Sequence, residues 1–170
     1  MQIRLLLPAD ADAYRRLRLR ALREHPEAFT SSHEAEALRA PEWHAQRLAG
    51  TDTQFWGAWA DGQLFGVVGV DREQRVKNRH KGTVVGLYVA PEFKGLHAGR
   101  ALLEAAVAQA RIAGIELLVL TVTAGNDAAL HLYERLGFRS FGVEPRAIKV
   151  GGQPFDKNHM FLELAPSAPS

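Results

Sequence analysis

The stretch that most constrains the fold is Val84–Leu103, VVGLYVAPEFKGLHAGRALL. It begins with an apolar run typical of a buried strand, and Pro91, which has no backbone N–H, ends that run. A short polar loop follows. From about Gly99 the apolar residues recur at helical spacing. The sequence therefore predicts a strand at Gly82–Ala90 and a helix at Gly99–Ala113, joined by a tight loop.

A loop of this kind suits an anion-binding site at the beginning of a helix. The first N–H groups of a helix have no partner inside it, and the helix dipole favours negative charge there. Gly95 lies in the loop, and glycine lets the backbone close around a phosphate group. Lys94 and Arg100 flank the loop with positive charge. The pattern indicates a site for a phosphate or diphosphate.

Two motifs of this chain resemble those of the GNAT superfamily of acyl-CoA-dependent N-acetyltransferases. Lys94, His97 and Gly99 occupy the family's Arg/Gln-x-x-Gly-x-Gly/Ala positions, and the first two differ from the consensus. The second signature, Asn-x-x-Ala-x-x-x-Tyr-x-x-x-Gly-Phe, is complete here. Its residues are Asn126, Ala129, Tyr133, Gly137 and Phe138. The resemblance covers roughly Ile3 to Leu164 and has both motifs in the family's order.

The resemblance implies a single GNAT-like domain at 1–164, with an α+β fold. A central twisted mixed sheet of about seven strands would be flanked by about four helices. Periodicity and turn residues predict the remaining elements. They are strands Ile3–Leu7, Gln54–Ala60, Leu64–Asp71, Glu116–Val122, Phe138–Gly142, Arg146–Val150 and His159–Leu164, and helices Asp10–Glu24, Pro41–Gly50 and Asn126–Leu136. The segment Pro26–Ala40 is expected to be irregular, and the tail 165–170 to be disordered.

Composition excludes several classes of protein. The chain has 170 residues, of which 46% are apolar and 24% charged, as is usual for a single globular domain. It has no cysteine, which fits a reducing cytoplasm. A net charge of +2 is too small to indicate nucleic-acid binding. The chain has no run of about 20 apolar residues, the length that is needed to span a membrane. We expect a cytoplasmic protein that binds neither nucleic acid nor a membrane. A homodimer is left open, because dimers are common in such folds.

The resemblance implies acetyl-CoA as the acetyl donor. In the family, the loop binds the diphosphate of coenzyme A, and the preceding strand pairs through its backbone with the pantetheine arm. The cofactor-binding residues implied in this way are Leu87, Tyr88, Val89, Lys94, Gly95, Leu96, His97, Ala98, Gly99, Arg100, Asn126 and Ala129. His97 fits this loop if its φ is negative and is an obstacle if the position needs φ > 0. Asn126 is expected to be a helix N-cap, a cofactor ligand, or both.

The resemblance also implies the catalytic acid. Tyr133 stands where the family has a tyrosine that protonates the departing thiolate. The base is open, because Gly82–Ala90 has no acid where many members carry a glutamate. A relay of water molecules ranks first among the alternatives. The other candidates for the base are Glu34, Glu36, His80 and His159.

The acceptor site is expected between the first two helices, where the family places it. The candidates for binding the acceptor are Ser32, Glu34 and Glu36, although each of the two glutamates, taken separately, is more typical of an exposed loop charge. The histidines have no metal-ligand spacing, so no metal site is expected. The expected function is direct acetyl transfer from acetyl-CoA to a primary amine of a small molecule or peptide. The alternative is an acyl-CoA-binding regulatory module with little or no turnover, because His97 departs from the motif and the strand acid is missing.

Overall fold

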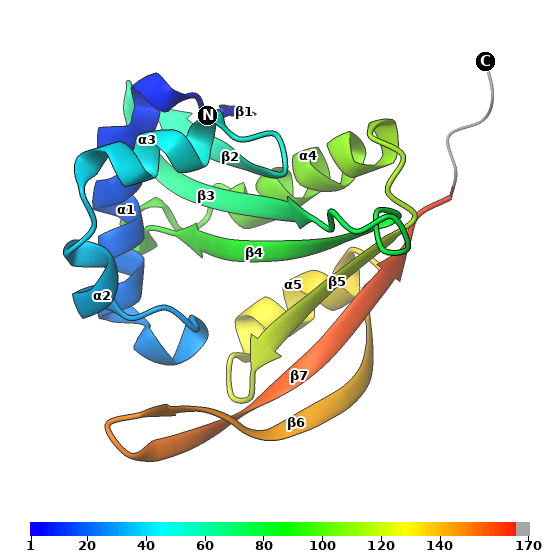
Figure 1. Cartoon of the computed structure of the whole chain (residues 1–170). Coiled ribbons are helices and arrows are strands. Elements are labelled where there is room, and N and C mark those ends of the chain that lie inside the picture. The colour runs from blue at the N-terminus through cyan, green and yellow to red at the C-terminus, as the bar shows by residue number, and fades with distance from the viewer. Residues whose placement is uncertain (166–170) are drawn as a thin grey trace.

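A mixed β-sheet with helices on both faces forms the computed structural model, which describes residues 1–165 (Figure 1). The sheet has seven strands in the order β1-β2-β3-β4-β5-β7-β6. The strands are β1 (Gln2–Leu5), β2 (Thr53–Ala60), β3 (Gln63–Arg72), β4 (Lys81–Val89), β5 (Leu117–Thr123), β6 (Arg139–Val150) and β7 (Gln153–Glu163). The α-helices are α1 (Ala11–Glu24), α2 (His33–Ala37), α3 (Pro41–Ala49), α4 (Ala98–Ile112) and α5 (Asp127–Arg135). Among residues 1–165, no helix has the length and hydropathy needed to cross a bilayer.

The structure corrects the predicted elements in three places. Helix α2 forms inside the segment that was expected to be irregular, so the described residues hold five α-helices rather than about four. The two predicted strand pieces are one strand, β6, whose register with β7 shifts twice. Strand β7 begins at Gln153 rather than His159, because pairing with β6 extends it through polar residues. Of the tail expected to be disordered, residues 166–170 lie outside the described part.

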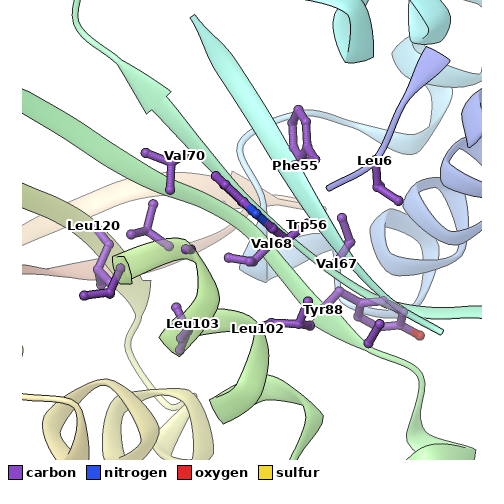
Figure 2. Packing of buried hydrophobic residues seen from close by; sticks show 14 of the residues in the cluster. Leu6, Phe55, Trp56, Val67, Val68, Val70, Tyr88, Leu102, Leu103 and Leu120 are labelled. Carbon is purple, nitrogen blue, oxygen red and sulfur yellow. The ribbon is translucent and has the colours of Figure 1, made fainter. Parts of the chain in front are cut away.

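The core lies on both faces of β2–β4. Leu102 and Leu103 of α4 are completely buried, and Figure 2 shows them on the side of the sheet that carries Val68. On the opposite side, Phe55 packs against Tyr14 of α1, with ring centroids 5.1 Å apart. Each fully buried side chain of this size contributes about 1.5–3 kcal/mol. The two packed layers hold β4 and the beginning of α4 in fixed positions.

Strands β4 and β5 are parallel neighbours that separate along their length. They pair only where Lys81–Thr83 meets Leu117–Val119, and beyond that point they diverge toward their carboxyl ends (Figure 1). The register between β3 and β4 shifts nearby, where Gly86 has a φ of 64°. A bulge of this kind bends a strand and increases its twist. The divergence therefore follows from the end of pairing on one side of β4 and from the bulge on the other.

His44 of α3 is a polar side chain inside the core. It has no exposed surface, and neither ring nitrogen has a hydrogen-bond partner among residues 1–165. The rings of Trp43 and Tyr14 lie 4.8 Å and 6.0 Å from it. Burial lowers the pKa of His44 below its ordinary value of 6.5, while Glu36 opposes the shift. The native protein therefore favours the neutral imidazole.

This burial predicts a loss of stability in acid. Below pH 6.5 the unfolded chain binds a proton at His44 that the native state does not, so the free energy of unfolding falls as the pH falls. We expect His44→Leu to lose less stability than the wild type between about pH 7.5 and 5.5 in urea unfolding. His80→Leu, at an exposed histidine, is the control and should keep the wild-type pH dependence. Equal pH dependence in His44→Leu and wild type would contradict this explanation.

Candidate active site

A cleft of about 1040 Å³ lies where β4 and β5 diverge. Its walls are the end of β4, the loop and first turn of α4, the β5–α5 connection with α5, and the α1–α2 connection. The cleft is at the upper end of the roughly 300–1,000 Å³ usual for small-molecule sites. Three cationic side chains line it, Lys94, Arg100 and Arg135, against one carboxylate, Glu27. The shape and charge suit a long ligand with anionic groups.

All of the implied cofactor residues except Leu96 line this cleft. Those lining it are Leu87, Tyr88, Val89, Lys94, Gly95, His97, Ala98, Gly99, Arg100, Asn126 and Ala129. The side chain of Leu96 is 47% exposed and is not part of the lining. The strand, loop and helix predicted from one continuous stretch therefore form one side of the cleft, and Asn126 and Ala129 belong to its α5 side.

The beginning of α4 lacks a side-chain cap. His97 precedes the helix without capping it, and the first turn has no acidic residue. In α5, by contrast, the Asn126 side chain accepts a hydrogen bond of 3.3 Å from the Ala129 N–H. Asn126 is thus the N-cap of α5, which was one of the two roles expected for it. The first amides of α4 remain available to an anion in the cleft.

His97 adopts the left-handed conformation, with φ 55° and ψ 32°. Gly95, two residues earlier, also has a positive φ, of 96°. The position does require φ > 0, so the condition under which a histidine is unfavourable here is met. A side chain in this conformation costs about 1–2 kcal/mol. The loop keeps its conformation at that cost.

Replacing His97 by glycine should therefore stabilise the fold. We expect the free energy of unfolding of His97→Gly, measured in urea, to rise by about 1 kcal/mol. Ala108→Gly, at an exposed helical position of α4, is the control and should lower it by about 1 kcal/mol. A loss of stability in His97→Gly as large as in Ala108→Gly would show that this backbone conformation carries no strain.

A network of ionic side chains fixes the end of α1 against β4. The hydroxyl of Tyr88 donates a hydrogen bond of 2.6 Å to Glu24, which also accepts one of 2.8 Å from Arg20. Arg20 holds Glu92 as well, and this contact keeps the pKa of Glu92 at about 2. Burial, followed by the bond to Glu24, raises the pKa of Tyr88 above its usual range. The phenol of Tyr88 is therefore engaged.

Tyr133 of α5 carries the phenol that is not engaged. Its side chain is 7% exposed and packs edge-on against Phe138, with ring centroids 5.8 Å apart. The hydroxyl makes no hydrogen bond to the described residues, and burial raises the pKa of Tyr133 to about 12. Tyr133 does not itself line the cleft, although its neighbours Ala129 and Leu132 do. A neutral, proton-bearing phenol thus lies behind the α5 wall.

Residues 18–138 match the sequence model of the acetyltransferase (GNAT) family. The match covers more than half of the chain. The chain belongs to the GNAT family.

Known proteins agree with this membership. A mycothiol acetyltransferase of Cellulomonas flavigena is 32% identical over 150 residues, which are 84% of this chain and 41% of that protein. The chain thus spans about two fifths of this relative's length. A GNAT acetyltransferase from Streptococcus pneumoniae superposes with a TM-score of 0.83 at 25% identity, covering 96% of this chain and 99% of that one. A Salmonella typhimurium protein solved with acetyl-CoA gives 0.80 at 24% identity, covering 100% and 97%. The expected GNAT fold is confirmed.

The residues expected to bind the acceptor of this GNAT protein are placed outside the cleft lining. Ser32 caps α2, since its hydroxyl accepts a hydrogen bond of 3.1 Å from the Ala35 N–H. Glu36 is buried and accepts three hydrogen bonds of 2.9–3.2 Å from Arg18, which join α2 to α1. Glu34 is exposed. Glu36 therefore has a structural partner that the sequence did not reveal.

The other candidates for the base are also away from the cleft lining. His80 is an exposed residue before β4, and His159 has a hydrogen-bond distance of 2.8 Å to Glu144. The structure instead brings His25, Glu27 and Phe29 into the lining. Sequence analysis missed these three. Phe29, an aromatic residue in an otherwise polar segment, was the signal that could have identified this wall.

Proposed function

We propose that this GNAT protein transfers an acetyl group from acetyl-CoA to a primary amine of a small molecule or peptide. The observation that carries the proposal is the cleft itself, which has the uncapped start of α4 on one side and α5 on the other, with Tyr133 behind the α5 wall. The family match supports acetyl transfer as the class of reaction. The relatives named above are acetyltransferases as well.

The chain would hold the donor through backbone groups and charge. The amides of Ala98 to Arg100 face the diphosphate, and Lys94 adds a positive charge that attracts it. Backbone groups of Leu87 and Val89 pair with the pantetheine arm, as an added strand would. A backbone N–H of β4 polarises the thioester carbonyl and stabilises the negative charge that develops on its oxygen.

Transfer requires the amine nitrogen to lose two protons and the departing sulfur to gain one. An ordinary alkylamine has a pKa near 10.4, so a proton must leave it before attack, and a relay of water molecules to solvent takes that proton. The amine nitrogen then forms a bond to the thioester carbon as the carbon–sulfur bond breaks, and Tyr133 gives its proton to the departing thiolate. The second proton of the nitrogen leaves through the water relay, which returns a proton to the Tyr133 phenolate. The phenol suits this role because burial keeps it protonated.

A non-catalytic acyl-CoA-binding module is the second candidate. Two observations favour it: the strained conformation of His97 in the phosphate loop, and the lack of an acidic residue on β4. Such a module would bind acetyl-CoA in the same cleft without transferring the acetyl group.

One experiment separates the two candidates. The protein is incubated with acetyl-CoA and a panel of amino acids, polyamines, aminoglycosides and peptides, and release of the free thiol of coenzyme A is followed. Calorimetry measures acetyl-CoA binding in parallel. Thiol release that depends on an amine supports the enzyme. Binding without release across the panel supports the module, and no binding contradicts both.

A further inference from the structure

The connection between α1 and α2 lines part of the cleft. We call residues Glu24–Thr30 the strap. It leaves α1, makes a 3-10 turn at Pro26–Ala28 and continues toward α2 (Figure 1). His25, Glu27 and Phe29 of the strap line the cleft. The strap is therefore both a connection and a wall of the site.

One end of the strap is attached to β4. Glu24 accepts the hydrogen bond of 2.6 Å from the Tyr88 hydroxyl, and the ring of His25 lies 6.1 Å from the ring of Tyr88. Arg20 bonds to both Glu24 and Glu92, the latter in the turn that follows β4. This end of the strap is therefore joined to β4 and to the turn that follows β4.

The other end is attached to β5 and β7. The Thr123 hydroxyl donates a hydrogen bond of 2.7 Å to the carbonyl of Glu27, and the Lys157 ammonium donates one of 2.9 Å to the Thr30 hydroxyl. Thr123 and Lys157 are cross-strand partners, and their side chains are only 5% and 9% exposed. A buried polar group that loses its partner destabilises the fold, because nothing then offsets its desolvation. These two bonds are therefore expected to hold the strap closed.

The two attachments lie on strands that have already separated. The strap runs from β4 to β5 and β7, and polar bonds attach it at each side. Lys157 is informative, because a hydrophobic residue would fill the same space without the desolvation of an ammonium. Its described side-chain bond is to the strap. The geometry thus links the position of the strap to Thr123 and Lys157.

We propose that Thr123 and Lys157 are positioning residues for the acceptor amine. They hold the Glu27–Phe29 part of the strap as the surface that orients the amine toward the thioester. This inference rests on the proposed acetyl transfer. A displacement of about 1 Å in such a wall can lower a rate by about 100-fold, because reaction depends on the geometry of approach.

The test compares variants that remove each bond with variants that keep it. Thr123→Val and Lys157→Met remove the donors with little change in volume, whereas Thr123→Ser and Lys157→Arg retain them. We expect the first pair to raise the KM for the amine and to lower kcat/KM by about 10- to 100-fold. In the first pair, acetyl-CoA affinity should not change, and the backbone amides of residues 25–30 should exchange hydrogen faster than in the wild type. Thr123→Ser, which retains the hydroxyl, should keep the wild-type activity. Thr53→Val, which removes a similar hydroxyl bond to Asp71, should leave all constants unchanged.

Three results would overturn the inference. Wild-type kcat and KM in Thr123→Val and Lys157→Met would mean that the bonds serve the fold alone. A loss of acetyl-CoA affinity in these two variants as large as the loss in kcat/KM would mean that the strap holds the donor and not the acceptor. Absence of turnover in the wild-type protein would overturn the proposed function and this inference together. With an active wild-type protein, either of the first two results would overturn the positioning role alone.

Discussion

Tyr133→Phe should lower kcat for acetyl transfer by about 100- to 10,000-fold, the range that a positioned general acid contributes. The substitution removes one hydroxyl, which has no hydrogen-bond partner among the described residues, and keeps the packing against Phe138. The acetyl-CoA dissociation constant should therefore stay at its wild-type value. The loss should appear in kcat, since the proton is needed only as the carbon–sulfur bond breaks.

Tyr14→Phe is the matched control for this experiment. Tyr14 is also a buried tyrosine, with a pKa that burial raises, but it lies on α1 against Phe55 and away from the cleft lining. We expect it to keep the wild-type kcat. Steady-state kinetics and calorimetry on both variants decide the matter. A Tyr133→Phe protein with an unchanged kcat would remove this phenol from the mechanism.

Gly99→Val should weaken acetyl-CoA binding by about 100-fold, which corresponds to about 2.7 kcal/mol. A Cβ at this position would lie 3.2 Å from a terminal methyl of Leu132 and 3.9 Å from one of Val89. Both neighbours line the cleft, so the two further methyl groups of valine would extend into the space that the donor needs. Gly99→Ala should have a smaller effect, because the end of Leu132 can move.

Calorimetry with acetyl-CoA, together with a melting curve for each variant, tests this expectation. Gly142→Val is the control, since a Cβ at this position of β6 would meet no atom within 4 Å and valine suits a strand. It should bind acetyl-CoA as the wild type does. A folded Gly99→Val protein with wild-type affinity would show that the donor does not pass between β4 and α5.

The loop before α4 was predictable because its information is local. Strand, loop and helix follow one another within Val84–Leu103, and the structure places β4 and α4 within about one residue of the predicted bounds. The apolar spacing and Pro91 determine those bounds without help from the rest of the chain. The positive φ of His97 is different. The sequence left both signs of φ open at His97, and only the folded loop showed that φ is positive.

The strap side of the cleft was not predictable, because bonds between residues distant in the sequence form it. In the sequence, Glu36 resembles a free loop carboxylate, but in the structure it is paired with Arg18. Thr123 bonds to Glu27 across 96 positions of the sequence, and Lys157 to Thr30 across 127. No periodicity joins residues so far apart. The same holds for β6, where register shifts that depend on β7 made one strand resemble two.

The most direct test of the account is an experimental structure of the protein with coenzyme A. The account predicts a diphosphate on the amides of Ala98 to Arg100, and a sulfur atom within hydrogen-bond distance of the Tyr133 hydroxyl. A coenzyme A molecule bound outside this cleft, or one in the cleft with its sulfur remote from Tyr133, would contradict it.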